Sequence, residues 1–204
     1  AYYNPTTNEI CFPAAILQPP FFDPNADDAV NYGAIGGVIG HEMSHGFDDQ
    51  GSQFDKTGNQ RNWWTDQDKT NYNARTKVLA DFFSKVEILP GKFINGQQTL
   101  GENIGDNGGL NIAYRALQNT LKQNPTGKIE GFTPDQRFLL TWARVWAGNF
   151  RPEYVEYLIT VDVHSLAKAR VNAALPQIDA WYDAFGIKKS DKLFVPKKKR
   201  AQRS

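Results

Sequence analysis

Two histidines four residues apart, His41 and His45, constrain the fold of this chain more than any other feature. They lie in the segment His41-Glu42-Met43-Ser44-His45, within residues 30–48, where the pattern is helical. Positions i and i+4 of an α-helix share a face, so both imidazoles can converge on one Zn²⁺. Glu42 is then placed to take a proton from water that the metal activates. The chain has only three histidines, which makes a chance match improbable.

A catalytic zinc site needs a third protein ligand and an open position for water. The metzincin pattern would put glycine at position 48 and histidine at position 51. The chain has Asp48 and Gly51 there, which excludes that type. The third ligand must therefore be the remaining histidine, His164, or a carboxylate.

Two carboxylates, Glu102 and Asp106, are also four residues apart and face the same side of an expected helix. One could bind zinc, and the other could hydrogen-bond a ligand histidine and fix its tautomer. The alternative is that Glu102 completes a capping box with Thr99 and faces solvent. Spacing alone leaves both possibilities open.

A third polar group consists of Asp162, His164 and Arg170. Asp162 could orient His164, raise its pKa and keep it protonated. A protonated histidine can stabilise the oxyanion that forms during peptide hydrolysis. Taken without the other motifs, this group is better explained as a structural cluster of charged side chains.

Periodicity and helix-start signals predict a mainly α chain with minor β structure. Thr65 with Asp68, and Thr133 with Pro134 and Gln136, are typical of helix N-termini. Helices are expected over about 30–48, 66–86, 100–123, 134–148, 152–160, 165–171 and 176–185, with one short strand near 10–12.

Four glycines, at positions 33, 36, 37 and 40, have near-helical spacing. No Lys-Ser or Lys-Thr follows them, so a phosphate-binding loop is a weak interpretation. Small residues on one helix face are more typical of a place where another element packs closely.

Composition excludes several classes of protein. A hydrophobic content of 40% is enough for a core, and a net charge of +1 gives no electrostatic reason to expect a nucleic-acid partner. No apolar run approaches the roughly 20 residues that span a bilayer. Cys11 is the only cysteine, which excludes an internal disulfide and a cysteine-based zinc site. The basic stretch 197–200 is expected to be a solvated end.

These segments together resemble the M13 family of zinc metallopeptidases, which includes neprilysin, endothelin-converting enzyme and bacterial oligopeptidase O. The resemblance rests on residues 1–3, 12–22, 41–49, 101–109, 150–154 and 162–170. It implies a thermolysin-like zincin of the gluzincin type. Residues 1–204 would be the C-terminal catalytic domain of a longer chain, whose missing N-terminal region would close the chamber around the substrate.

The resemblance also implies roles for single residues. His41, His45 and Glu102 match the zinc ligands, and Glu42 matches the general base. Asp106 matches the residue usually given as the proton donor, although its spacing favours a hydrogen bond to a zinc-bound histidine.

The remaining roles follow in the same way. Asp48 would hydrogen-bond the other zinc-bound histidine. His164, oriented by Asp162, matches the stabiliser of the transition state, and Arg170 matches an arginine near the substrate carbonyl. The apolar pocket for the residue after the scissile bond would be lined by Ile16, Phe21, Val38 and Trp146.

The function expected on this basis is that of an endopeptidase with one zinc per chain. It would hydrolyse oligopeptides on the amino side of large hydrophobic residues. A peptide-binding module without activity would be expected to have lost Glu42 or a ligand, and a structural zinc protein would have four ligands rich in cysteine. A further possibility is that the whole enzyme is active but this piece alone is not. The lone Cys11 favours a bacterial-type cytoplasmic enzyme, with a secreted or periplasmic location as the alternative.

Overall fold

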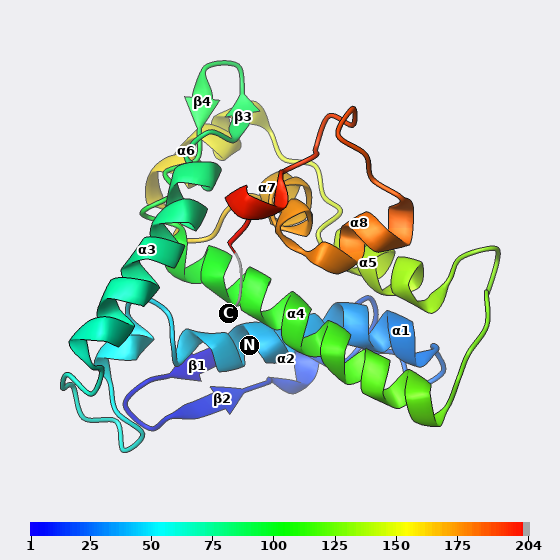
Figure 1. Ribbon diagram of the computed structural model, residues 1–204, viewed down its shortest axis with the longest axis horizontal. Helices are drawn as coiled ribbons and strands as arrows, with labels where there is room; N and C mark the ends of the chain where they lie inside the picture. The colour runs from blue at the N-terminus through cyan, green and yellow to red at the C-terminus, as the bar shows by residue number, and fades with distance from the viewer. Residues whose placement is uncertain (202–204) are drawn as a thin grey trace.

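The computed structural model describes residues 1–201, and most of them are helical, as the sequence predicts (Figure 1). The helices are α1 (Asp28–Asn31), α2 (Gly37–His45), α3 (Asp66–Phe83), α4 (Leu100–Gln123), α5 (Pro134–Val145), α6 (Pro152–Val161), α7 (Ala167–Asn172) and α8 (Asp179–Phe185). The strands are β1 (Tyr2–Asn4), β2 (Glu9–Cys11), β3 (Glu87–Leu89) and β4 (Lys92–Phe93). None of the helices in this described part is long and apolar enough to cross a membrane.

The strands form two small antiparallel pairs. Strand β1 pairs with β2, with Tyr3 opposite Ile10, and β3 pairs with β4 beside the end of α3. The sequence predicted a strand near residues 10–12 but neither its partner β1 nor the β3–β4 hairpin. Strands of two or three residues carry too few side chains for an alternating pattern to be recognised.

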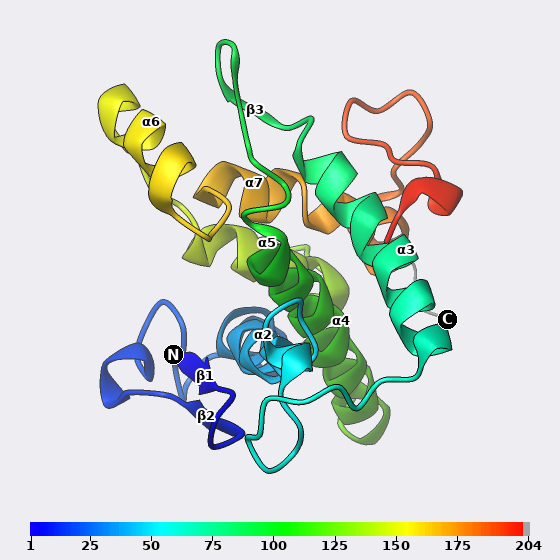
Figure 2. The same cartoon turned by 90° about the vertical axis from the view of Figure 1, so that its left-hand side faces the viewer.

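Helices α2 and α4 cross in close contact, and this crossing builds the site (Figures 1 and 2). A methyl group on Gly40 would lie 2.7 Å from the Cα of Gly109, and one on Gly109 would lie 2.5 Å from the backbone nitrogen of His41. The two backbones therefore touch directly, which confirms the prediction that this glycine-rich face receives another element. The contact brings the histidines of α2 against the carboxylates of α4.

We expect Gly40→Ala to lower the free energy of unfolding by about 1–2 kcal/mol. Overpacking costs about 1–3 kcal/mol, and replacing a helical glycine regains up to about 1 kcal/mol. Urea unfolding monitored by circular dichroism measures the difference. Gly127→Ala is the matched control, since an added methyl there meets nothing within 4 Å. Equal midpoints for Gly40→Ala and wild type would show that the helices do not need this contact.

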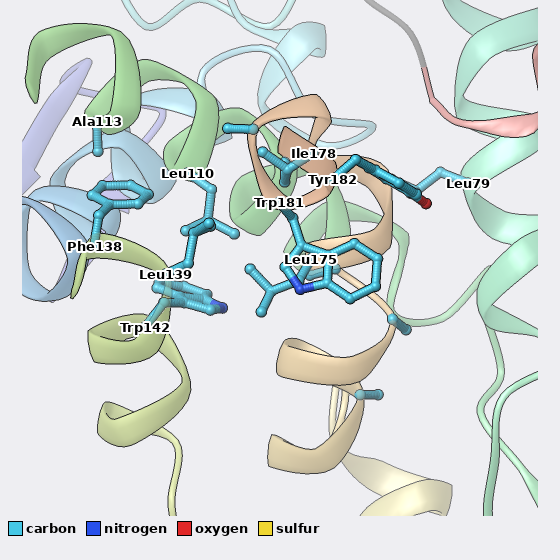
Figure 3. Close-up of a cluster of buried hydrophobic side chains, with 14 of the residues drawn as sticks. Leu79, Leu110, Ala113, Phe138, Leu139, Trp142, Leu175, Ile178, Trp181 and Tyr182 are labelled. Atoms are coloured by element: carbon cyan, nitrogen blue, oxygen red, sulfur yellow. The ribbon is translucent and has the colours of Figure 1, made fainter. Parts of the chain in front are cut away.

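Helix α5 carries the centre of the core. Phe138, Leu139 and Trp142 are at most 1% exposed and pack near Leu110 of α4 (Figure 3). The indole nitrogen of Trp142 donates to the backbone carbonyl of Arg170 at 2.9 Å. Since Arg170 belongs to the polar cluster described below, the core directly positions part of the site.

Both predicted helix-start signals are confirmed. The Thr65 hydroxyl accepts from the backbone of Asp68, and Thr133 makes the same bond with Gln136, each with the reciprocal bond of a capping box. The prediction of a solvated basic end is wrong for Arg200. Arg200 is 9% exposed, stacks over the Tyr182 ring and donates to Asp179 at 2.6 Å.

Candidate metal centre

Three side chains from the crossing helices α2 and α4 converge on one point. The Nε2 atoms of His41 and His45 are 3.0 Å apart, and Nε2 of His41 lies 3.0 Å from Oε2 of Glu102. One nitrogen or oxygen atom from each of the three residues lies within 4.8 Å of the others. The predicted ligands His41, His45 and Glu102 are therefore brought together.

The capping-box alternative for Glu102 is wrong. Thr99 makes no side-chain cap bond to α4, and its hydroxyl donates instead to the carbonyl of Asn95 at 3.1 Å. The side chain of Glu102 is only 13% exposed and points at the histidines instead of solvent.

A carboxylate holds the outer nitrogen of each histidine ring. Nδ1 of His41 is 2.9 Å from Asp106, and Nδ1 of His45 is 2.7 Å from Asp48. The tautomer with a proton on Nδ1 satisfies these bonds, and it leaves the Nε2 lone pair of each ring free to bind a cation. Asp48 is itself fixed, because its other oxygen accepts from the backbone nitrogens of Gln50 and Gly51.

The donor set fits a zinc ion. Two histidine nitrogens and one carboxylate oxygen are a common ligand set for catalytic zinc, and two nitrogens bound tetrahedrally at about 2.0–2.1 Å lie roughly 3.3–3.4 Å apart. Oε2 of Glu102 is buried, and it lies 3.0 Å from Nε2 of His41 and 3.3 Å from Nε2 of His164. Lone pairs facing one another at these distances require a positive charge between them.

A proton can supply part of that charge. Burial lowers the pKa of the His41 imidazole, but the carboxylates of Asp106 and Glu102 outweigh burial and raise this pKa to about 9. A metal that binds here at neutral pH must therefore displace a proton from His41.

Arg170 keeps Asp106 ionised. Burial alone would raise the pKa of Asp106, but the guanidinium of Arg170 beside it and the hydrogen bond to His41 lower this pKa to about 2. Two bonds join the pair, from Nε at 2.9 Å and from Nη2 at 2.6 Å. An ionised carboxylate accepts hydrogen bonds and has no proton to donate. Asp106 is therefore better suited to orient the His41 ring than to act as a proton donor.

Arg170 itself is buried beside Asp106. It is 7% exposed, and its guanidinium stacks over the ring of Trp146 at 3.7 Å. Its Nε and Nη2 donate to Asp106, and Arg170 is not among the residues that line the cavity beside the three candidate ligands. The predicted contact with a substrate carbonyl stays a prediction.

A cavity of about 390 Å³, here called the histidine cavity, opens onto the three candidate ligands. Glu42 lines it and is 5% exposed, with its Oε2 at 3.9 Å from Nε2 of His45. The other lining residues are Ala1, Tyr2, Tyr3, Pro5, His41, His45, Asp48, Gln50, Gly51, Glu102 and His164. The sequence suggested no role for Tyr2, Tyr3 or Gln50, although Ala1-Tyr2-Tyr3 was one of the segments that carry the resemblance.

His164 reaches the histidine cavity from the loop between α6 and α7. Its Nε2 lies 3.3 Å from Oε2 of Glu102, and its Nδ1 is 2.8 Å from Asp162. The side chain is 47% exposed. His164 thus stands beside the ligand set with an accessible ring, and Asp162 orients it as the sequence predicts.

The four residues predicted for the apolar pocket lie outside the described lining of this cavity. Val38 is 8% exposed on α2, and Trp146 follows α5 and packs edge-on against Trp142. Ile16 ends a short 3₁₀ helix, and Phe21 accepts a backbone bond from Ile35 at 3.0 Å. Their role in substrate binding stays a prediction.

Known proteins match this chain over almost its whole length. The model for peptidase family M13 matches residues 1–201. Neprilysin of Homo sapiens is 42% identical over 205 residues, which covers 98% of this chain and 27% of neprilysin. Endothelin-converting enzyme 1 of Rattus norvegicus is 44% identical over 178 residues, which covers 86% of this chain and 23% of that enzyme.

Solved structures show the same fold. The Mycobacterium tuberculosis zinc metalloprotease Zmp1, in complex with an inhibitor, superposes with a TM-score of 0.96 at 47% identity. The match covers 99% of this chain and 32% of Zmp1. The chain spans about a quarter of the length of the curated relatives it matches. The matched family model and these identities establish that the chain belongs to peptidase family M13.

Proposed function

We propose that this chain is the catalytic part of a zinc-dependent endopeptidase that hydrolyses oligopeptides. The observation that carries the proposal is the convergence of His41, His45 and Glu102 beside a cavity that Glu42 also lines. Since the relatives are about four times longer, the activity belongs to a longer protein that includes this chain.

Two rival functions have less support. A peptide-binding module would not need a buried carboxylate such as Glu42 facing the cavity. A structural zinc site is usually closed by four protein ligands, whereas this cluster has three and borders a cavity.

Zinc held by His41, His45 and Glu102 would act as a Lewis acid. It would polarise a peptide carbonyl and lower the pKa of bound water to about 7. Glu42 takes a proton from the attacking water and passes it to the leaving amine. Asp48 and Asp106 hold the two imidazoles in the tautomer that leaves Nε2 free.

His164 donates a hydrogen bond to the oxyanion, and Asp162 orients the ring for this purpose. Arg170 acts through Asp106, whose negative charge it balances. Both assignments use groups that already contact each other, at 2.8 Å for Asp162 and His164.

The preference for cleavage before large hydrophobic residues is part of the proposal. The pocket would be formed by Ile16, Phe21, Val38 and Trp146, and the support is their apolar character and the resemblance that suggested them. A cytoplasmic location likewise remains a prediction.

Removal of the metal tests the proposed function. We expect a chelator to abolish cleavage of a fluorogenic peptide by the full-length protein, and one equivalent of zinc per chain to restore it. The melting temperature should fall on removal, because a ligand that binds only the folded state stabilises it. Calcium or magnesium in place of zinc is the control. Full cleavage by protein shown by mass spectrometry to hold no metal would overturn the proposal.

A further inference from the structure

We propose that Asn103, Ser165 and Gln98 form a clamp that holds the His164 loop against α4 and so positions His164. This inference rests on the proposed function, because it assigns positioning residues to that reaction. The loop, residues 162–166, links α6 to α7 and carries an exposed histidine ring. Something must fix it if Nε2 of His164 is to stay near Glu102.

The first half of the clamp is a chain of buried hydrogen bonds. The Ser165 hydroxyl donates to Oδ1 of Asn103 at 2.7 Å, and Nδ2 of Asn103 donates to the Thr99 hydroxyl at 2.9 Å. Thr99 in turn donates to the carbonyl of Asn95 at 3.1 Å. Asn103, Ser165 and Thr99 are 1%, 4% and 4% exposed.

The direction of this chain makes asparagine the suitable residue. The proton of the Thr99 hydroxyl is used on Asn95, so Thr99 can only accept from its neighbour. Asn103 must therefore present its amide nitrogen to Thr99 and its oxygen to Ser165. A carboxylate at position 103 could not donate to Thr99, and an alanine would remove both the donor to Thr99 and the acceptor of the Ser165 hydroxyl.

The second half of the clamp lies at the other end of the loop. Nε2 of Gln98 donates to the backbone carbonyl of Asp162 at 2.9 Å. Within the loop, Oδ1 of Asp162 accepts from both the backbone nitrogen and Nδ1 of His164. Asp162 is thus tied to Gln98, just before α4, and Ser165 is tied to Asn103 in the first turns of α4, which also carry Glu102.

This arrangement gives Asn103 a reason to be adjacent to a metal ligand. Residues 102 and 103 point about 100° apart around the helix, so one reaches the histidines and the other reaches the loop. Any movement of α4 then carries Glu102 and His164 together. The distance of 3.3 Å between Glu102 and His164 is kept by the helix.

Hydrogen exchange tests whether the clamp holds the loop. In the full-length protein we expect Ser165→Ala and Gln98→Ala each to speed amide exchange in peptides covering residues 160–168. Peptides from α5 should be unchanged. Thr141→Val, which removes a buried hydroxyl that bonds within α5, is the control and should leave the loop unchanged. Unchanged exchange of the loop in both clamp variants would overturn the inference.

A double-mutant cycle tests whether the clamp acts through His164. We expect Ser165→Ala to lower kcat about tenfold, with KM within about twofold and the zinc content unchanged. In a His164→Gln background the same change should cost less than about twofold. An equal loss in both backgrounds would show that Ser165 acts independently of His164 and would overturn the inference. If the zinc-loaded wild type has no peptidase activity, the proposed function fails, while hydrogen exchange still decides whether the clamp exists.

Discussion

Replacing Glu42 with glutamine is expected to lower kcat by about 10²–10⁴-fold without loss of zinc. Glutamine has nearly the same shape, so it fits the site where Glu42 is 5% exposed. Its amide cannot take a proton from water, so the variant removes the general base while keeping the size and shape of the side chain. Steady-state kinetics on a fluorogenic peptide, with zinc measured by mass spectrometry on the same sample, give both quantities.

The matched control for this variant is Glu153→Gln, the same change at an exposed position in the first turn of α6. Its kcat should stay within about twofold of wild type. Should Glu42→Gln keep most of the activity with zinc in place, Glu42 is not the general base, and the hydrolytic mechanism would need another residue of the histidine cavity.

The sequence was sufficient to predict the elements that carry strong local signals. Thr65 and Thr133 begin helices because their hydroxyls accept backbone bonds from the third residue of the helix, a local interaction. The i, i+4 spacings of His41 with His45 and of Glu102 with Asp106 predicted shared helix faces for the same reason. These features depend on residues within one or two turns of each other.

The features that the sequence did not predict depend on distant contacts. That Glu102, and not Asp106, faces the two Nε2 atoms follows from where α4 crosses α2, with Gly40 and Gly109 in contact at the crossing. The burial of Arg170 against Asp106 and Trp146 likewise joins three separate segments. The spacing of residues could therefore suggest which side chains belong to the site, but not which role each of them has.

Replacing Glu102 with glutamine is expected to weaken zinc binding far more than replacing any group that holds a histidine. The change removes the only carboxylate among the three candidate ligands and sets an amide beside Nε2 of His41, 3.0 Å away. The negative charge of Glu102, which attracts the cation, is lost as well. We expect a loss of zinc affinity of more than about 100-fold, the upper end of what the loss of a histidine partner costs. Competition with a chromogenic zinc chelator measures it.

Asp106→Asn provides the comparison that separates the two roles. An amide at position 106 can still accept from Nδ1 of His41, but it leaves the guanidinium of Arg170 buried without its counter-ion. We expect zinc affinity to fall about 10–100-fold, less than for Glu102→Gln, together with a lower melting temperature. If Asp106→Asn lost more zinc affinity than Glu102→Gln, the roles of the two carboxylates would have to be exchanged. Zinc would then be bound by the carboxylate that Arg170 pairs with, and Glu102 would be the accessory group.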